Sequence, residues 1–328
     1  MIKRREFIGG LGSTVAWPLV ARAQQGEQVR RIGVLLNAVA DDQESQIRVG
    51  AFLQALALLG WTVGRNVRID THWGTPNPAE IRKHAAELAA LAPDVILANG
   101  AIAVGPLLQV TRSVPIVFAG VTDPVGSGLV DSLARPGGNA TGFVTFEFST
   151  SGKWVELLKQ IAPSVMRMAI LRSTNLGPTA QFGVIQAVAA SLKVEVTPVN
   201  LSDADEIERA IAAFAHAPNG GLVVTSSAAA ELNRDLIITL ADRHKLPAVY
   251  PFRYFVAGGG LISYGPNITD HYRSAARYVD RILRGEKPGN LPVQVPTKYE
   301  TAINLKTAKA LGLTIPETLL ATADEVIQ

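Results

Sequence analysis

The chain has 328 residues, of which 31 are Lys or Arg and 28 are Asp or Glu, and it contains no cysteine. Four basic residues and one acidic residue fall in the first 23 positions, so the remainder carries no formal net charge and no Lys/Arg run. This balance argues against a nucleic-acid partner, which requires a basic footprint. The lack of cysteine excludes disulfides and a cysteine-linked lipid anchor, and the length suggests two domains with cores of their own.

The first 23 residues have the pattern of an export signal. Lys3-Arg4-Arg5 precedes a short apolar run over 7–20, and Ala21-Arg22-Ala23 supplies a small-x-small cleavage site. The paired arginines and the Glu-Phe-Ile that follows resemble a twin-arginine signal. The run is shorter than the ~20 residues of a membrane-spanning helix and contains a proline. We therefore expect residues 1–23 to be cleaved near Ala23 and the remaining chain to be periplasmic and not embedded in a membrane.

From residue 30 onward, short apolar runs alternate with amphipathic stretches, which is typical of βαβ units and a mainly parallel sheet. The first half predicts strands over 32–36, 67–71, 94–97 and 116–119, and helices over 46–59, 79–91, between the last two strands, and over 124–134. The second half predicts strands over 168–171, 194–197, 222–225 and 248–250, and helices over 179–192, 204–214 and 229–244.

The two halves resemble each other in their order of apolar run, polar tip, helix and Leu/Val-Pro strand start. Residues 94–118 match residues 221–250 in this way. The sequence therefore predicts an α/β fold with two doubly wound, Rossmann-like lobes and a ligand cleft between them. Chain crossings are expected near Gly142, at Gly265-Pro266 and over 292–296. The predicted lobes accordingly consist of 30–142 plus 266–296, and of 143–265 plus 297–328.

Motifs for catalysis or metal binding are not found in the sequence. The five histidines form no His-x-x-x-His pattern, no Gly-x-Ser-x-Gly elbow occurs, and no phosphate loop or Gly-x-Gly-x-x-Gly fingerprint is complete. We predict no catalytic residue, no metal and no cofactor.

Neutral polar residues stand instead where the predicted strands end, the edge at which open parallel sheets bind ligands. These residues lie at 37, 99–101, 122–123, 173–175, 225–227, 250 and 263–264. Hydroxyls, amides and free helix-end N–H groups suit a ligand carboxylate or carbonyl, and Asp123 suits an amine. Each group also has a simpler explanation, because Asp123-Pro124 is a typical helix start and the serines are typical helix caps.

Several long segments resemble the TrpX-type substrate-binding proteins of ABC transporters. They are Pro-Ile-Val-Phe-Ala-Gly-Val-Thr-Asp-Pro-Val-Gly-Ser-Gly and its continuation over 115–143, together with 152–163, 303–316 and 323–327. The resemblance implies a type I periplasmic-binding fold that carries a small-molecule ligand to an inner-membrane ABC permease. Some relatives are associated with aromatic amino acids. We expect the chain to act as a monomer.

Carried over by position, the resemblance implies eight ligand-facing residues: Asn37, Ala101, Thr122, Asp123, Ser173, Thr174, Ser226 and Tyr250. The chain departs from many relatives where Ser173-Thr174-Asn175 replaces an Asn-Pro pair, and where 99–103 is poor in hydroxyls. The ligand therefore stays open between an amino acid, an aromatic compound and another small organic molecule.

Two other functions remain possible at this point. An extracytoplasmic sensor would share the fold but present its closed form to a receptor kinase instead of a permease. An exported α/β enzyme would require a carboxylate or histidine pair in the cleft, and no spacing forces Asp123 to meet His72 or His271.

Overall fold

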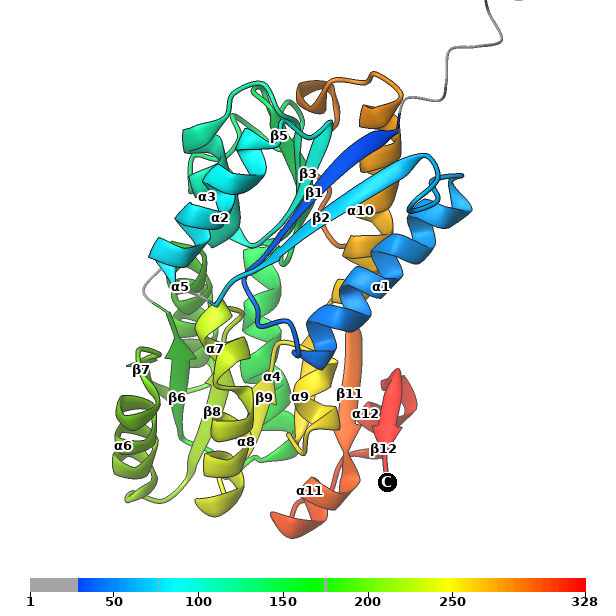
Figure 1. The fold of residues 1–328 in the computed structure, drawn as a ribbon. Coiled ribbons are helices and arrows are strands. Elements are labelled where there is room, and N and C mark those ends of the chain that lie inside the picture. Colours follow the sequence, from blue (N-terminus) through cyan, green and yellow to red (C-terminus); the bar gives the residue numbers. More distant parts are fainter. Residues whose placement is uncertain (1–28, 76, 174–175) are drawn as a thin grey trace, which may run out of the picture.

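The computed structural model describes residues 29–75, 77–173 and 176–328, so the predicted signal peptide lies outside the described residues. The chain forms two β-sheets, each flanked by helices, that lie one above the other in Figure 1. The elements are β1 (Arg30–Leu36), α1 (Gln43–Leu58), β2 (Val67–Trp73), α2 (Pro78–Ala90), β3 (Val95–Asn99), α3 (Ala101–Val110), β4 (Ile116–Val121), β5 (Ala140–Val144), η1 (Phe148–Ser151), α4 (Gly152–Ile161), β6 (Arg167–Arg172), α5 (Leu176–Ser191), β7 (Glu195–Asn200), α6 (Ala204–Ala215), β8 (Gly220–Val224), α7 (Ala228–Leu232), α8 (Arg234–Arg243), β9 (Ala248–Tyr250), α9 (Arg253–Ala257), β10 (Ile262–Gly265), α10 (Ile268–Leu283), η2 (Pro288–Asn290), β11 (Glu300–Asn304), α11 (Leu305–Ala310), α12 (Glu317–Thr322) and β12 (Glu325–Ile327).

Lobe one is built on a five-stranded, fully parallel sheet with the order β2-β1-β3-β4-β5. Its central strands are buried on both faces, and the run from Ile32 to Leu36 in β1 shows why: it is almost continuously apolar. Helices α1 and α10 pack against each other on one face, and α2 and α3 on the other. The strand order reverses at β1 and β3, so the carboxyl ends of these strands mark the expected ligand edge.

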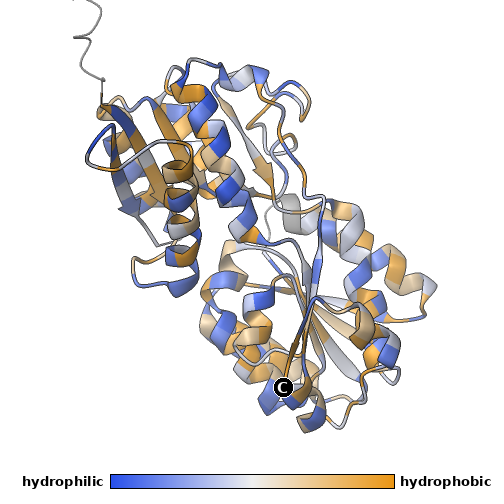
Figure 2. Cartoon of the chain, turned by 90° about the vertical axis from the view of Figure 1, so that its right-hand side faces the viewer, coloured by the Kyte–Doolittle hydropathy of each residue, from blue (hydrophilic) through white to orange (hydrophobic). Residues whose placement is uncertain are grey.

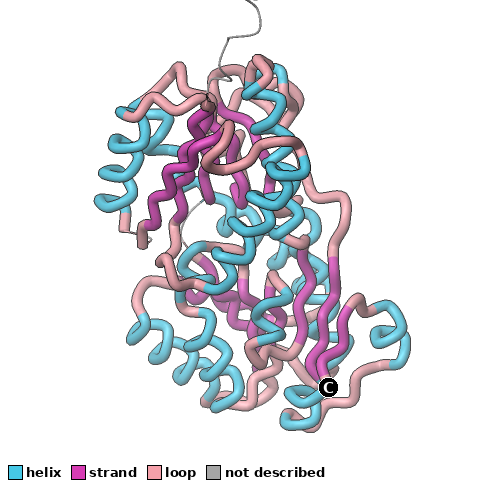
Figure 3. Tube along the Cα trace, turned by 45° about the vertical axis from the view of Figure 1, so that its right-hand side comes forward, coloured by secondary structure: helices cyan, strands magenta, loops and turns pink. Residues whose placement is uncertain are grey.

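Lobe two is built on a seven-stranded sheet with the order β12-β11-β10-β9-β8-β6-β7. Strands β6 to β10 are parallel to one another, whereas β11 runs antiparallel to β10 and β12 runs parallel to β11, so the two strands at this end of the sheet point the opposite way. Helices in both lobes show hydrophilic and hydrophobic bands, as expected for elements with one face on a sheet and one in solvent (Figure 2). In both lobes the strands lie among helices (Figure 3), and the carboxyl ends of most strands point toward the other lobe (Figure 1).

The chain passes between the sheets three times, after β5, between β10 and α10, and before β11. Aromatic side chains hold these crossings together. The ring of Tyr299 stacks on Tyr264 with centroids 5.5 Å apart, and Trp154 donates a hydrogen bond of 2.7 Å to the carbonyl of Tyr264. Because the three connections lie side by side and pack on one another, they restrict the lobes to a hinge-like motion.

The structure corrects two of the predicted helices. Residues 124–134 form turns, because the chain turns once after Asp123 and then takes a positive φ of 66° at Gly128. The predicted helix over 229–244 is divided into α7 and α8 at Asn233, whose side chain donates a hydrogen bond to the carbonyl of Ala229. The other predicted strands and helices are present with ends shifted by a few residues.

Within the described parts of the chain, no helix combines the length and the apolar character needed to cross a membrane.

Candidate functional site in the cleft

A cavity of about 650 Å³ lies between the lobes, within the ~300–1,000 Å³ that is usual for small-molecule sites. Its lining comes from strand ends and helix starts of both lobes. The lining residues are Asn37, Arg48, Pro78, Asn99, Gly100, Ala101, Ile102, Gly120, Thr122, Asp123, Ser127, Thr145, Ser226, Ser227, Ala228, Glu231, Phe252 and Ile268.

Two asparagines line the cavity on the side of lobe one, which we call the lobe-one wall. Asn37 follows β1, Asn99 ends β3, and the side-chain amide of Asn99 donates a hydrogen bond to Oδ1 of Asn37. Gly120 makes this arrangement possible, because its φ is +75° and a Cβ there would lie 2.9 Å from Oδ1 of Asn99. The wall is therefore fixed by a backbone conformation that favours glycine.

The first turn of α3 opens onto the same wall. Its N-cap is Gly100, with a φ of +74°, and no side chain among the described residues caps the helix. The first N–H groups of a helix have no intrahelical partner and lie at the positive end of the helix dipole. The backbone at Ala101 and Ile102 is therefore suited to receive a carboxylate or another anionic group.

Asp123 lies in the cavity lining beside Thr122, directly after β4. Its Oδ1 accepts a hydrogen bond of 2.8 Å from the backbone N–H of Gly126, so it does cap a turn. A carboxylate has four lone-pair sites, which leaves capacity for a ligand ammonium group. The structure thus allows both roles for this side chain at once.

Two serines lie on the lobe-two side of the cavity. Ser226 and Ser227 follow β8, and Oγ of Ser227 accepts a hydrogen bond of 3.2 Å from the N–H of Ala230. On the lobe-one side, Thr145 follows β5, and its backbone N–H donates a hydrogen bond of 2.9 Å to the carbonyl of Val121, while its buried Oγ1 has no hydrogen-bond partner among the described residues. An unpaired buried hydroxyl costs free energy, so a ligand atom that pairs with it gains affinity.

Two ion pairs connect the lobes beside the cavity. Nη1 of Arg48 in α1 lies 3.1 Å from Oε2 of Glu231 in α7, and Nη1 of Arg234 in α8 lies 3.0 Å from Oδ1 of Asp42. The Arg48 side chain is only 4% exposed and lies over the ring of Tyr254. Burial acts to lower the pKa of Arg48, but Glu231 and the neighbouring tyrosines raise it further, so the guanidinium stays charged.

The structure brings five of the eight predicted residues to this cavity: Asn37, Ala101, Thr122, Asp123 and Ser226. Ser173 follows β6 and is buried, with an Oγ that has no partner among the described residues, but it lies outside the cavity lining. Thr174 is outside the described residues. Tyr250 is fully enclosed, with its ring stacked on Phe255 at 5.1 Å, and burial raises the pKa of its hydroxyl.

Sequence reasoning missed Arg48, Glu231 and Thr145. Arg48 lies within a predicted helix, and the only available signal is its position between the apolar residues of the buried face. Glu231 follows Arg48 by 183 positions, so only the fold brings the two together.

A second cavity, of about 440 Å³, lies along α10 and the third crossing. Charged side chains such as Arg277, Arg281, Lys298 and Glu300 line it, and it does not touch the ends of the central strands. We therefore place the candidate site in the cleft cavity.

The comparisons with known proteins agree with this geometry. The sequence model of the family "ABC transporter substrate binding protein" matches residues 31–327, which is nearly the whole chain. The chain belongs to this family. The resemblance to TrpX-type substrate-binding proteins is thereby confirmed, as is the type I periplasmic-binding fold.

Three relatives of this substrate-binding protein are informative. A tyrosine-binding protein of Clostridioides difficile (strain R20291) is 26% identical over 269 residues, which cover 80% of this chain and 75% of the relative. A crystal structure of an ABC domain from Streptococcus pneumoniae in complex with L-Trp is 25% identical, with a TM-score of 0.83 over 91% of this chain and 99% of the other. A conserved domain protein from Vibrio cholerae O1 biovar El Tor (strain N16961) is 26% identical, with a TM-score of 0.85 over 91% and 100% of the two chains.

Proposed function

We propose that this substrate-binding protein captures an amino acid with an aromatic or apolar side chain in the cleft and delivers it to an inner-membrane ABC permease. The observation that carries the proposal is the pairing of an uncapped helix start at Ala101 with the carboxylate of Asp123 in one cavity. Two relatives support the ligand class, since one is named as tyrosine-binding and another holds L-Trp. The basic and apolar start of the chain supports a periplasmic location after twin-arginine export and cleavage near Ala23.

The two ends of an amino acid have matching groups in the cavity. The ligand carboxylate would accept hydrogen bonds from the backbone N–H groups at Ala101 and Ile102, and from the hydroxyl of Ser226 or Thr145. The ligand ammonium would donate to Asp123, with Asn37 and Thr122 beside it. Ser173 follows β6, the neighbour of β8, and stays a proposed contact of the ligand, as does Thr174, which lies outside the described residues.

The side chain of the ligand would occupy the apolar part of the lining, formed by Ile102, Phe252 and Ile268. Aromatic and aliphatic groups suit such a surface because their burial releases apolar area from water. We leave Tyr250 out of the proposed contacts because its ring is enclosed within lobe two.

Closure would bring the two walls onto the ligand by the hinge that the three crossings provide. The Arg48–Glu231 and Arg234–Asp42 pairs connect the lobes beside the cavity and would stabilise the closed form. We propose that the chain does this as a monomer and without catalysing a reaction.

The test is isothermal titration calorimetry of the cleaved protein against L-Trp, L-Tyr, L-Phe and L-Leu, together with indole-3-propionate, which lacks the amine. We expect saturable binding of at least one amino acid and a concentration-dependent rise in Tm. Asp123→Asn should weaken that binding by about 1.5–3 kcal/mol, since a hydrogen bond to a charged group is lost.

Indole-3-propionate provides the internal control, because Asp123→Asn should leave its affinity unchanged. Asp131→Asn, which alters an exposed acid outside the cavity lining, should leave all affinities unchanged. Unchanged amino-acid affinity in Asp123→Asn, with only a lower Tm, would reduce Asp123 to a turn cap and contradict the proposed ligand orientation.

A further inference from the structure

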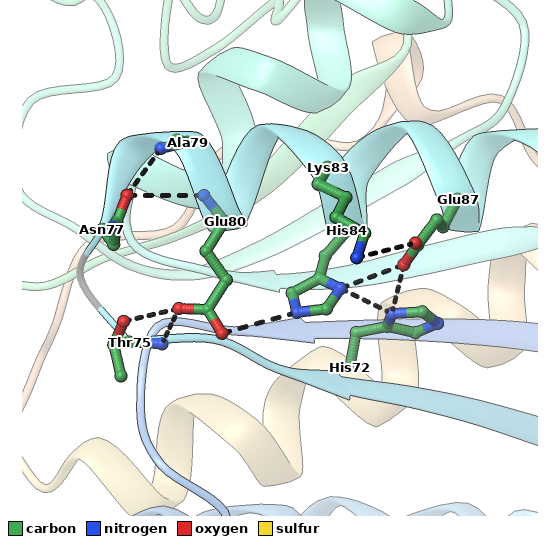
Figure 4. Close-up of polar contacts among 8 residues, drawn as sticks. All are labelled: His72, Thr75, Asn77, Ala79, Glu80, Lys83, His84 and Glu87. Carbon is green, nitrogen blue, oxygen red and sulfur yellow. Dashed lines mark hydrogen bonds and ion pairs between the residues drawn. The ribbon is translucent and has the colours of Figure 1, made fainter.

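Two histidines and a glutamate converge on lobe one, outside the cleft cavity, where α2 packs on β2 (Figure 4). His72 lies on β2, and His84 and Glu87 lie on α2, three positions apart and on one face of the helix. Nδ1 of His72 is 3.1 Å from Nδ1 of His84, which is 3.0 Å from Oε2 of Glu87. The third side of this triangle, from Nδ1 of His72 to Oε2 of Glu87, measures 3.4 Å.

The size of this triangle matches one face of a metal coordination tetrahedron. An ion that holds nitrogen and oxygen ligands at about 2.0–2.1 Å in tetrahedral geometry keeps the ligand atoms roughly 3.3 Å apart. All three measured sides lie close to that value. Two imidazole nitrogens with one carboxylate oxygen also form a ligand set that zinc sites use.

Hydrogen bonds alone do not satisfy all three sides of the triangle. If only one of the two Nδ1 atoms carries a proton, the other nitrogen is an acceptor. It then faces the carboxylate oxygen of Glu87, which is also an acceptor, with no proton between them. If both carry a proton, the two N–H groups face each other across 3.1 Å. A cation at the centre pairs with all three atoms at once.

A second carboxylate, that of Glu80, lies on the other side of the His84 ring. Its Oε1 lies 3.8 Å from Nε2 of His84, and its Oε2 accepts hydrogen bonds from the backbone N–H and the hydroxyl of Thr75. A carboxylate on this side of the ring favours the proton on Nε2, which leaves Nδ1 as the free ligand atom. Figure 4 shows Glu80 and Glu87 on opposite sides of the His84 ring.

We propose that His72, His84 and Glu87 form a binding site for Zn²⁺ or a similar divalent transition metal, with the fourth position open to solvent. Such an ion would tie the edge strand β2 to α2, the helix whose first residue, Pro78, lines the cleft cavity. Sequence reasoning predicts no metal here because the three ligands come from two elements and form none of the usual short metal motifs. The proposal is independent of the ligand proposed for the cleft.

The experiment titrates the cleaved protein, prepared without a polyhistidine tag, with Zn²⁺ and with Co²⁺. We expect one saturable site at micromolar Zn²⁺, a rise in Tm that depends on Zn²⁺ concentration, and an intense visible absorption band for bound Co²⁺ that reports tetrahedral geometry. Mg²⁺ should compete poorly, because it prefers six oxygen ligands.

Variants assign the binding to these residues. His72→Ala and His84→Ala should each weaken Zn²⁺ binding by more than ~100-fold, since even the loss of a group that only supports a metal ligand costs about 10–100-fold. Glu80→Gln, which alters such a supporting group, should fall within that smaller range. His244→Gln, at the end of α8 in lobe two, is the matched histidine control and should bind Zn²⁺ as the unaltered chain does.

Circular dichroism of each metal-free variant separates a lost site from a lost fold. Absence of saturable Zn²⁺ binding in the unaltered, folded chain would overturn the proposal. Binding that survives both His72→Ala and His84→Ala would overturn it equally, because the ion would then lie elsewhere.

Discussion

The two lobes share a doubly wound sheet, but they bring different groups to the cavity between them. Lobe one contributes two amides, a carboxylate and a helix start whose positions are fixed by left-handed glycines and by mutual hydrogen bonds. Lobe two contributes Ser226, Ser227 and a short helix, and it meets lobe one through two ion pairs. Hydroxyls come from both lobes, since Thr122, Ser127 and Thr145 line the cavity on the lobe-one side. The difference suggests that lobe one sets the geometry of recognition, whereas lobe two closes over the ligand.

Acid should have the largest effect on the stability of the protein, because a buried histidine lies in lobe one. Burial, helped by Arg48 and opposed by Asp270, lowers the pKa of His271 on α10 from an ordinary value of 6.5 to about 4. Between pH 6.5 and 4, the imidazole of His271 is therefore protonated in the unfolded chain and neutral in the folded chain. This difference should leave the free energy of unfolding unchanged above pH 6.5 and lower it by up to about 3 kcal/mol as the pH drops toward 4.

Urea unfolding at a series of pH values measures this loss. His271→Gln should flatten the pH dependence over that window, even if the substitution itself shifts the baseline. His244→Gln should keep the dependence of the unaltered chain. An equal slope in the unaltered chain and in His271→Gln would show that other groups cause the acid sensitivity.

The rigid wall of lobe one can be disturbed through a single glycine. Gly120→Ala should lower the free energy of unfolding by about 1–3 kcal/mol, because φ is +75° there and the new Cβ would meet Oδ1 of Asn99. It should also weaken ligand binding, since the amide pair would have to move. Both quantities are measured by urea unfolding and calorimetry.

Gly60→Ala is the matched control for this prediction. Its φ is +94°, and a Cβ there would meet no described atom within 4 Å, so it carries the backbone strain without the clash. We expect a smaller loss of stability and unchanged ligand affinity. If Gly120→Ala also left affinity unchanged, the asparagine wall would have no role in recognition.

The contact between the lobes can be weakened at Glu231, which also belongs to the cavity lining. Glu231→Gln removes the charge that faces buried Arg48 across the lobe boundary, and should weaken ligand affinity by about 1–2 kcal/mol because the closed form loses a stabilising pair. The expected loss is small because Glu231 is one-third exposed and solvent screens the pair.

Glu208→Gln serves as the control for Glu231→Gln. Glu208 pairs with Arg243 within lobe two, at 2.6 Å and on the surface, so its loss should not affect binding. Equal affinities of the two variants would argue against a role of the Arg48–Glu231 pair in closure.

The smallest expected effect concerns the unpaired hydroxyl of Thr145. Thr145→Val keeps the shape but removes a buried Oγ1 that has no partner in the described structure, so stability without ligand should change by less than about 1 kcal/mol. Ligand affinity should fall by about 0.5–1.5 kcal/mol if the ligand pairs with that hydroxyl.

Thr141→Val gives the reverse pattern and completes the comparison. Oγ1 of Thr141 donates a buried hydrogen bond of 2.6 Å to the carbonyl of Leu291, so its loss should lower stability and leave affinity unchanged. A Thr145→Val variant that behaves like Thr141→Val would assign the hydroxyl to the fold and not to the ligand.

The fold could be predicted largely from the sequence because parallel strands buried on both faces form continuous apolar runs. The errors arose where local signals conflicted. Asp123-Pro124 is a strong helix start, but the glycine at 128 takes a positive φ that ends the turn. Asn233 divides a stretch that is helical in its apolar spacing.

The candidate site could be predicted only where residues follow strand ends. Asn37, Thr122 and Ser226 were chosen by that rule, and they lie in the cavity lining. It does not settle side-chain direction, and at the end of β9 the ring of Tyr250 faces the core of lobe two. Arg48 and Glu231 could not be predicted, because their meeting depends on how one lobe sits on the other.

Small-angle X-ray scattering with and without a saturating amino acid tests most directly whether the lobes close over a ligand. The radius of gyration should fall when the amino acid is added to the unaltered chain, and should fall less in Glu231→Gln at the same degree of saturation. A radius of gyration that stays the same while calorimetry shows full occupancy would contradict closure of the cleft around its ligand.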